Sequence, residues 1–488
     1  MSDRSQLTRR ATLKLGLGIG ALALGSGGCG AAGDRCPPGP LPGGVPDGGA
    51  ASEAQRLLSG IDTIVAVMME NRSFDHLFGS LSTDAAYPAA GKIDGLTGTE
   101  TNRDASGLPV GVNLAPSETS KLDPKHDWNS SHTAWNNGRN DQFVLVNPGA
   151  NQAEVMSYHQ RATAPYLYSL CDQYAVCDRW FASVMGPTWP NRYYLHAATA
   201  AGHKTNLPMG LNPPPTVWQR LADRCVPASY YYAGSVPWYS VTFPANSFSG
   251  NDAVAPKTID HFFTDAANGS LPAFSIIDPD FGVNDGHPPY DFGLCEAFLS
   301  SIHRALAASV HWPRALLVIV FDEHGGYFDH VPPPTVPDPD PDFRLIGFRV
   351  PAVVVGPQVR TGAVVSSPYD HVSILSTLAT RFGIASLGPR MDAAADLSAC
   401  IDPDRAAVMA PGSTTSPPAT SLSLPPPVEL PASVIRSAPF RPTSQPEMEA
   451  LARAGGVPAH HVDRRDPEQR LRAWLRHAQA LEAVRVIG

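Results

Sequence analysis

Oxygen-bearing side chains follow two apolar runs that lie far apart in the sequence, at 61–69 and 315–321. The polar residues that end these runs are Glu70, Asn71, Asp322 and Glu323. Carboxylate and amide oxygens are the ligands that hard and borderline cations take in proteins. A single acidic strand end is usually a helix cap or faces solvent. Two ends of the same kind favour a shared cation site.

A hydroxyl group at the predicted start of a helix, Thr188, is the candidate nucleophile. In GPTWPNRYY at 186–194 we place Thr188 at the N-cap and Pro190 just inside the helix. Free backbone N–H groups at a helix N-terminus attract phosphate, and a metal on the hydroxyl would lower its pKa and supply an attacking alkoxide. An ordinary capping threonine has the same pattern, so this residue alone leaves both interpretations open.

Histidines lie in or beside the loops that carry these groups. Imidazole can bind a metal, donate to phosphoryl oxygens or protonate a leaving group, although a lone loop histidine is usually solvated. The stronger candidates are His126, His132, His287 and His324. His330 and His371 are weaker ones.

A sheet is needed to bring these loops together. Continuous apolar runs at 61–69 and 315–321 predict strands buried on both faces, as in parallel sheets. Further strands are predicted at 273–277 and 350–355, and helices at 164–180, 291–309 and 369–383. Strands alternating with helices predict an α/β fold with a doubly wound, mostly parallel sheet sandwiched by helices and carrying loop-rich inserts. Ligands bind such sheets at the carboxyl ends of strands.

Composition limits the class of protein and of partner. The chain has 488 residues, is 43% hydrophobic and 17% charged, and carries a net charge of −9. This length suits one large domain with insertions, or two domains. The acidic balance argues against nucleic acid as the main partner, because binding a phosphate backbone needs a basic face.

The N-terminus has the pattern of an export signal over residues 1–29. Arg9 and Arg10 precede a short Gly/Ala-rich apolar run, which favours the twin-arginine route over a chance pair in an ordinary signal peptide. The run is too short to span a membrane. Cys29 could carry a lipid anchor, but Ser26 stands where a lipoprotein signal has leucine. Residues 30–51 are a Gly/Pro-rich tether.

Seven cysteines occur without a CxxC zinc pattern. An exported protein can form disulfides, but the pairing cannot be deduced from the sequence. Cys171 and Cys177 flank a short apolar segment, and buried thiols are an equal alternative for them.

Three stretches resemble one family when taken together. MMENRSFDHLFG at 68–79, GPTWPNRYY at 186–194 and FDEHGGYFDHVPPP at 321–334 are similar to the bacterial phosphatidylcholine-hydrolysing phospholipase C and acid phosphatase family. HDWNSSHTAWNNGRNDQF at 126–143 also resembles the family's pattern. The resemblance implies an alkaline-phosphatase-like fold over 52–400 and one or more divalent metal ions, with zinc or calcium favoured.

The remaining chain matches nothing in the family pattern. Residues 401–445 are rich in Pro, Ser and Thr and are expected to wrap the surface or to be disordered. Residues 446–488 have helical composition and predict one or two helices. These departures concern substrate specificity and leave the core chemistry unchanged.

The resemblance also assigns roles to residues. The implied metal ligands are Glu70, Asn71, Thr188 and Glu323, with Asp322 adjacent. Thr188 matches the nucleophile. The implied lining of the phosphate pocket is His126 or His132, Asp141 and His287, with His324 beside the ligand pair. The choice between His126 and His132 stays open.

The function expected from these arguments is that of an exported phospholipase C. It would cleave phosphatidylcholine-like phospholipids at a membrane surface to diacylglycerol and phosphocholine, and His287 would protonate the leaving alkoxide. An acid phosphatase acting on monoesters is the nearest alternative, and a non-catalytic surface lipoprotein is the more distant one. Aromatic residues at 230–239, with Trp135 and Trp189, could cage a choline ammonium or could simply pack in an insert.

Overall fold

The computed structural model describes residues 36, 41–43, 50–115, 122–149, 152–248, 254–410 and 424–488. The chain divides into two compact units, Met1–Pro40 and Leu41–Gly488, and all the elements below belong to the second. The predicted export signal, Cys29 and most of the predicted tether lie outside the described residues. None of the helices in the described ranges has the length and apolar character needed to cross a membrane.

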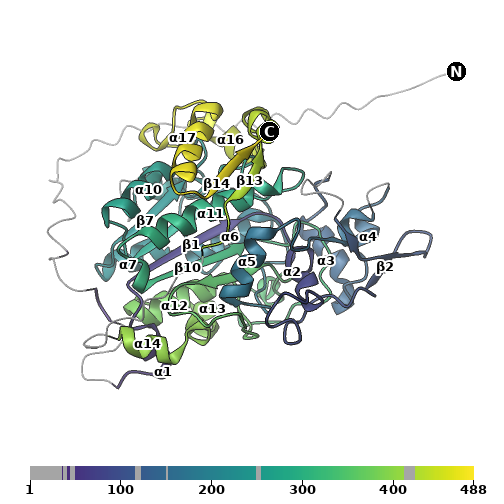
Figure 1. Cartoon of the computed structure of the whole chain (residues 1–488), viewed down its shortest axis with the longest axis horizontal. Helices are drawn as coiled ribbons and strands as arrows, with labels where there is room; N and C mark the ends of the chain where they lie inside the picture. Colours follow the sequence, from purple (N-terminus) through teal and green to yellow (C-terminus); the bar gives the residue numbers. More distant parts are fainter. Residues whose placement is uncertain are drawn as a thin grey trace. The chain divides into compact units, whose positions relative to one another are not determined.

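An eight-stranded sheet in the order β12-β6-β11-β10-β1-β9-β7-β8 forms the centre of the second unit (Figure 1). Strand β1 (Thr63–Met69) lies between β10 (Ala315–Phe321) and β9 (Phe274–Asp278) and is parallel to both. The outer strands are β11 (Ala352–Val355), β6 (Ala175–Val176), β12 (Ala363–Val364), β7 (Ala228–Tyr232) and β8 (Pro256–Thr258). Only β11 runs antiparallel to its neighbours. The predicted mostly parallel α/β sheet is confirmed.

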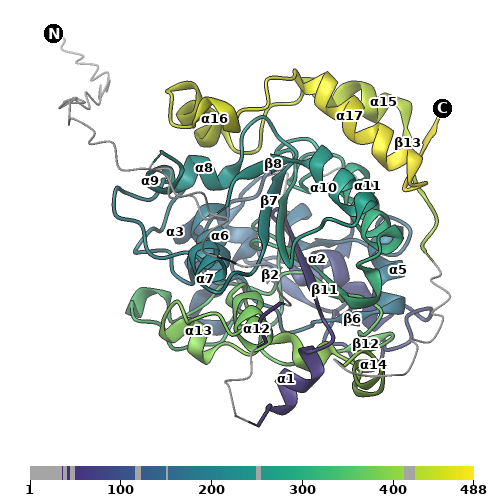
Figure 2. The ribbon, with the colours of Figure 1, turned by 90° about the vertical axis from the view of Figure 1, so that its left-hand side faces the viewer.

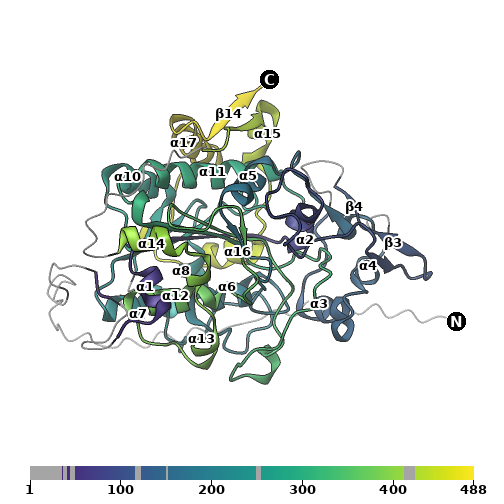
Figure 3. The ribbon, with the colours of Figure 1, turned by 60° about the horizontal axis from the view of Figure 1, so that its bottom comes forward.

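Helices cover both faces of this sheet (Figures 1 and 2). Helices α10 (Ile259–Asn268) and α11 (Phe292–Ala308) lie on one face, with α17 (Pro467–Ala480) packed outside them. Helices α6 (Thr188–Ala197) and α12 (Val372–Phe382) contact each other on the opposite face, as Figure 3 also shows. Two covered faces explain why the central strands are continuous apolar runs rather than alternating ones.

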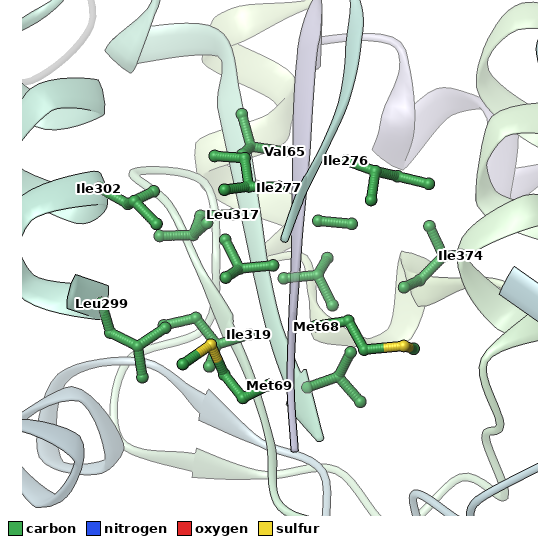
Figure 4. Packing of buried hydrophobic residues seen from close by; sticks show 14 of the residues in the cluster. Val65, Met68, Met69, Ile276, Ile277, Leu299, Ile302, Leu317, Ile319 and Ile374 are labelled. Atoms are coloured by element: carbon green, nitrogen blue, oxygen red, sulfur yellow. The ribbon is translucent and has the colours of Figure 1, made fainter. Parts of the chain in front are cut away.

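Side chains of β1 point alternately to the two helical layers (Figure 4). Val65 and Met69 lie on the side of Leu299 from α11, whereas Met68 lies on the side of Ile374 from α12. All of these side chains are fully buried. Burial on both faces fixes β1 firmly, so the residues that follow Met69 start from a rigid support.

Shorter elements fill the inserts and the C-terminal part. The remaining helices are α1 (Glu53–Leu58), α2 (Phe74–Phe78), α3 (Trp128–Trp135), α4 (Phe143–Val146), α5 (Pro165–Gln173), α7 (Val217–Asp223), α8 (Trp238–Thr242), α9 (Pro244–Phe248), α13 (Pro389–Ala393), α14 (Pro403–Met409), α15 (Ala432–Ser437) and α16 (Pro446–Arg453). The remaining strands are β2 (Thr101–Arg103), β3 (Pro109–Gly111), β4 (Asn113–Leu114), β5 (Ser157–Tyr158), β13 (Val428–Pro431) and β14 (Val484–Ile487).

One sequence prediction needs correction. The helix predicted at 164–180 ends at Gln173, because Tyr174 is extended and the next two residues join the sheet as β6. For 401–445 we expected surface wrapping or disorder, and its described residues contain α14, α15 and β13, which pairs with β14, so the disorder alternative does not hold for them. Residues 411–423 lie outside the described ranges.

The cysteines divide into two groups. Cys36 and Cys225 are disulfide-bonded. The free and buried cysteines within the described ranges are Cys171, Cys177, Cys295 and Cys400. The buried-thiol alternative for Cys171 and Cys177 is the one that this structure supports.

Candidate active site

The carboxyl ends of β1 and β10 are tied together by one carboxylate. Asp322 Oδ1 accepts the backbone N–H of Asn71 at 3.0 Å and that of Glu323 at 2.7 Å. Asn71 has a left-handed φ of 62°, which turns the chain sharply after the strand. Gly325 lies so close that a Cβ there would collide with the carbonyl oxygen of Asn71. The parallel pairing of β1 and β10 therefore brings the two predicted strand ends into contact.

Two unsatisfied oxygens lie at this junction. Asn71 Oδ1 and Glu323 Oε1 are buried and have no hydrogen-bond partner in the described part of the chain. His126 Nδ1 lies 2.6 Å from the carbonyl of Pro124 and donates to it, and His126 Nε2 accepts from Asn71 Nδ2 at 3.2 Å. His126 Nε2 also lies 3.8 Å from Glu323 Oε1. Buried amide and carboxylate oxygens without a partner suit a divalent cation.

Charges at the junction shift the pKa values of its groups. Burial raises the pKa of Asp322 to about 7, even though Arg192 opposes the shift. Burial would also raise the pKa of Glu323, but His126 and His324 bring it below its usual value. For His126, burial acts to lower the pKa, whereas Glu323 and Asp123 raise it above the ordinary value. These shifts favour an ionised Glu323 carboxylate beside His126.

Arg192 neutralises the carboxylates behind the junction. Its guanidinium donates to Asp278 Oδ1 at 2.9 Å, Glu70 Oε1 at 3.2 Å and Asp322 Oδ2 at 3.3 Å. The side chain is 1% exposed. One planar cation thus joins α6 to the ends of β1, β9 and β10. Our sequence prediction missed Arg192, although it stands inside the GPTWPNRYY stretch.

Glu70 is fully bonded by the protein itself. Besides Arg192, it accepts from Gln445 Nε2 at 3.1 and 3.0 Å and lies 3.2 Å from Ser444 Oγ. Burial raises the pKa of Glu70 well above its ordinary value, with Arg192 opposing. Its role as a metal ligand stays a prediction. Ser444 and Gln445 come from the C-terminal part and carry no recognisable sequence signal.

Thr188 is the first residue of α6 rather than the N-cap, which is Pro187. Pro187 is the extended cap residue, with φ −76° and ψ 178°, so the helix begins at Thr188, one residue earlier than we predicted. The turn before Thr188 is held by Asn191, whose Nδ2 donates to the carbonyls of Val184, Gly186 and Pro187. Thr188 lies one turn before Arg192 on α6, so the two residues share one face of the helix. Its side chain is buried.

His287 and His324 flank the junction. The rings of His287 and His126 are 6.1 Å apart, and Asp123 Oδ1 lies 4.0 Å from His287 Nε2 and 3.7 Å from His126 Nδ1. His324 Nδ1 lies 3.2 Å from Glu323 Oε2, and burial lowers the pKa of His324. His324 therefore contacts Glu323 directly, whereas His287 lies beside Asp123 and His126.

His132 and Asp141 make other contacts. The ring of His132 lies 4.3 Å from that of Trp128, and its Nδ1 is 2.7 Å from the carbonyl of Trp128. Asp141 accepts from Asn136 at 2.6 Å and from Arg139 at 3.2 Å. The structure therefore brings His126, and not His132, to the strand ends.

The family model for the phosphoesterase family matches residues 61–385, which include every residue of the junction except Ser444 and Gln445. The chain belongs to this family.

Named relatives in this phosphoesterase family are similar over two thirds of the chain. Non-specific phospholipase C1 of Arabidopsis thaliana is 31% identical over 374 residues, covering 67% of this chain and 68% of the relative. Phospholipase C A of Mycobacterium tuberculosis is 29% identical over 386 residues, covering 67% of this chain and 74% of the relative. The prediction of a phosphoesterase enzyme is confirmed.

Among solved structures, a protein in the alkaline phosphatase superfamily from Vibrio parahaemolyticus aligns with 73% of this chain and 72% of its own. Its sequence identity is 11% and its TM-score is 0.38. The α/β fold class rests on the sheet described above.

A second acidic cluster next to α2 has its own counter-charge. Asp75, Asp329 and His330 bring their ligand atoms within 4.8 Å of one another. Arg349, however, donates to Asp329 Oδ1 at 2.8 Å and to Asp75 Oδ1 at 2.9 Å. This arginine already supplies the charge that a metal would provide, so the cluster is structural. His371, the other weak candidate, donates to the carbonyl of Asp322 at 2.7 Å.

The aromatic residues of the 230–239 insert pack in the core. Trp238 is fully buried, with its ring 6.4 Å from that of Trp189 and 5.3 Å from that of His196. Tyr230 is also fully buried in β7. These side chains support the packing alternative and not a cage open to choline.

Proposed function

We propose that this phosphoesterase is an exported, metal-dependent phospholipase C with Thr188 as its nucleophile. The substrate would be a phosphatidylcholine-like phospholipid at a membrane surface, cleaved to diacylglycerol and phosphocholine. The observation that carries the proposal is that Asn71 Oδ1 and Glu323 Oε1, at two adjoining strand ends that α6 contacts through Arg192, are buried and unsatisfied in the described part of the chain. The names of the relatives, phospholipase C in both plants and bacteria, support the substrate class.

The residues that would hold the cation are Asn71, Glu323 and Thr188, with Glu70 and His126 as further candidates. A bound divalent cation, with zinc or calcium favoured, supplies Lewis-acid stabilisation of phosphoryl oxygens and lowers the pKa of a hydroxyl. Asp322 positions the set, because its two oxygens are occupied by backbone N–H groups and by Arg192.

The chain's own residues account for two displacement steps. Thr188 Oγ loses its proton to solvent and forms a bond to phosphorus, the bond from phosphorus to the glycerol oxygen breaks, and His287 gives that oxygen a proton. Diacylglycerol then leaves. Water forms the next bond to phosphorus, the bond to Thr188 breaks, and phosphocholine is released. Of the two protons of this water, one goes to the Thr188 oxygen and the other returns to His287. The positive end of the α6 helix dipole offsets the negative charge on the phosphoryl oxygens in both steps.

The test compares substrates and variants in one assay. Wild type, Thr188→Ala and Thr188→Ser are given phosphatidylcholine and, separately, a simple phosphate monoester. Thr264→Ala is the matched control, since this exposed threonine bonds only within α10 through Asp260. We expect diester turnover by wild type and by the control, a partial rate for Thr188→Ser and at least a 1,000-fold loss for Thr188→Ala.

Two outcomes would count against the proposal. Turnover of the monoester alone would favour an acid phosphatase, and full activity of Thr188→Ala would show that Thr188 is not the nucleophile.

Export is tested separately by replacing Arg9 and Arg10 with lysine and measuring the protein outside the cytoplasm. We expect export to fail in this variant, and unchanged export would exclude the twin-arginine route. Acylation of Cys29 is checked by mass spectrometry of the exported protein.

A further inference from the structure

A C-terminal segment, residues 441–445, enters the active site from outside the region that matches the family. Tyr290 donates to the carbonyl of Pro442 at 2.8 Å. A Cβ at Gly282 would collide with the same carbonyl oxygen, so the segment passes directly over the loop that follows β9. It then leads into α16, which packs against α8 (Figure 2).

Gln445 is the innermost residue of this segment and is 1% exposed. Its Nε2 donates to Glu70 Oε1 at 3.1 Å and to Oε2 at 3.0 Å, while its Oε1 accepts the indole N–H of Trp189 at 2.7 Å. An indole can only donate, so the carboxamide oxygen must face Trp189 and the NH₂ group must face Glu70. The orientation of Gln445 is therefore fixed from both sides.

Ser444 makes a second connection. Its hydroxyl lies 2.6 Å from Asp285 Oδ2 and 3.2 Å from Glu70 Oε2. The hydroxyl hydrogen goes to the nearer acceptor, Asp285. Asp285 is itself fixed because it accepts the backbone N–H groups of Gly282 and His287.

From these contacts we propose that Gln445 is a positioning residue of the active site. It joins the carboxylate of Glu70 to Trp189, the residue that follows Thr188, and so fixes the end of β1 relative to the start of α6. The C-terminal segment completes a site whose other members lie in the family region. The inference rests on the proposed function of Thr188 and Glu70.

The physical reason is that a carboxylate can rotate unless both oxygens are held. Arg192 contacts only Oε1 of Glu70, at 3.2 Å. Gln445 adds a contact to Oε2, so that Arg192 and Gln445 together hold both oxygens of the group. Outer partners of this kind typically alter metal affinity or activity by about 10–100-fold when removed.

The experiment uses the full-length protein carrying Gln445→Ala, with Gln479→Ala as control. Gln479 is exposed at the end of α17 and belongs to the same C-terminal part. Turnover of phosphatidylcholine gives kcat and KM, and calorimetric titration of the metal-free protein with Zn²⁺ or Ca²⁺ gives metal affinity. We expect Gln445→Ala to lose about 10–100-fold in kcat or in metal affinity with KM within threefold, and the control to match wild type.

A further variant, Trp189→Phe, keeps an aromatic ring but removes the N–H that orients Gln445. Its effect on kcat should not add to that of Gln445→Ala in the double variant, because both act through one contact. Thermal unfolding monitors whether each variant is folded. If Gln445→Ala is unfolded, the test uses Trp189→Phe, which is the smaller change. A Trp189→Phe variant with the kcat and metal affinity of wild type would then overturn the proposal.

Failure of this inference can be distinguished from failure of the proposed function. Metal titration needs no turnover, so the effect of Gln445→Ala is measurable even if phosphatidylcholine is not the substrate. Equal kcat and equal metal affinity in folded Gln445→Ala and wild type would overturn the positioning role. Full activity of Thr188→Ala would instead overturn the proposed function.

Discussion

Replacing Arg192 tests whether one cation holds the active-site framework together. Arg192 bonds three carboxylates and the carbonyl of Met68 from a fully buried position. Arg192→Met keeps much of the packing volume but removes the charge. The carboxylates of Glu70, Asp278 and Asp322, all buried, then lose their shared counter-ion.

The expected cost follows from that geometry. Removing one partner of a buried ion pair destabilises a protein by about 3–5 kcal/mol. Arg192→Lys keeps the charge but cannot reproduce the planar fork, so it should lose about 1.5–3 kcal/mol for each charged hydrogen bond left unmade. Typical domains have a free energy of unfolding of only about 5–15 kcal/mol, so Arg192→Met should be marginally stable.

Urea unfolding at several pH values is the assay. Without Arg192, the three carboxyl groups have pKa values raised further in the folded protein than in wild type. A group whose folded pKa is raised destabilises the fold as pH rises above its unfolded value, near 4 for a carboxyl group. The difference in unfolding free energy between wild type and Arg192→Met should therefore be larger at pH 8 than at pH 5.

Arg453→Met is the matched control, because Arg453 forms an exposed pair with Glu449 at 2.9 Å. Surface pairs of this kind contribute about 0–1 kcal/mol. The reasoning is refuted if Arg192→Met unfolds within about 0.5 kcal/mol of wild type at pH 8, the range of neutral surface changes. A larger loss at pH 5 than at pH 8 would refute it equally.

Three further outcomes follow from the structure. Burial acts to lower the pKa of His330, but Asp75 raises it to about 9 in the folded protein. Protonated His330 therefore stabilises the fold fully below about pH 6.5, and this contribution is lost as the pH rises from there to about 9. Urea titrations should show a fall of up to about 3 kcal/mol over that window in wild type, and a flat profile in His330→Gln would confirm the source. Gly325→Ala should cost about 1–3 kcal/mol by thermal unfolding, since φ is +62° and a Cβ would collide with Asn71; an unchanged melting temperature would contradict this. Chelation should abolish turnover and lower the melting temperature. Readdition of the cation should restore both in wild type but not in Asn71→Ala. Activity that survives exhaustive chelation would exclude a metal-dependent mechanism.

The strand ends could be predicted from the sequence because the residues that bury β1 and β10 form continuous apolar runs in the local sequence. Long apolar runs on both sides of a polar break indicate a central parallel strand and the point where it emerges. Glu70, Asn71, Asp322 and Glu323 follow from that signal. Adjacent parallel strands then bring the four residues to one edge without any further information.

Other features of the site depend on tertiary contacts and could not be predicted from the sequence. Nothing in residues 126–143 distinguishes His126 from His132, because the choice is made by the carbonyl of Pro124 and by contact with Asn71. Gln445 follows a Pro-rich stretch without periodicity, and its partners lie directly after β1 and in α6. The helix prediction at 164–180 was too long because an apolar run in an outer strand has the same composition as a helix face.

The contact between Gln445 and Glu70 joins residues separated by 375 positions. Ribosomes add about 5–20 residues per second, so roughly 20–75 s pass between the synthesis of the two residues. During that interval β1 can emerge and pair, but Glu70 lacks the amide group that holds both of its oxygens. A nascent or truncated chain that stops before Gln445 therefore has an unfinished site, and assembly of the complete site belongs to the last stage of synthesis.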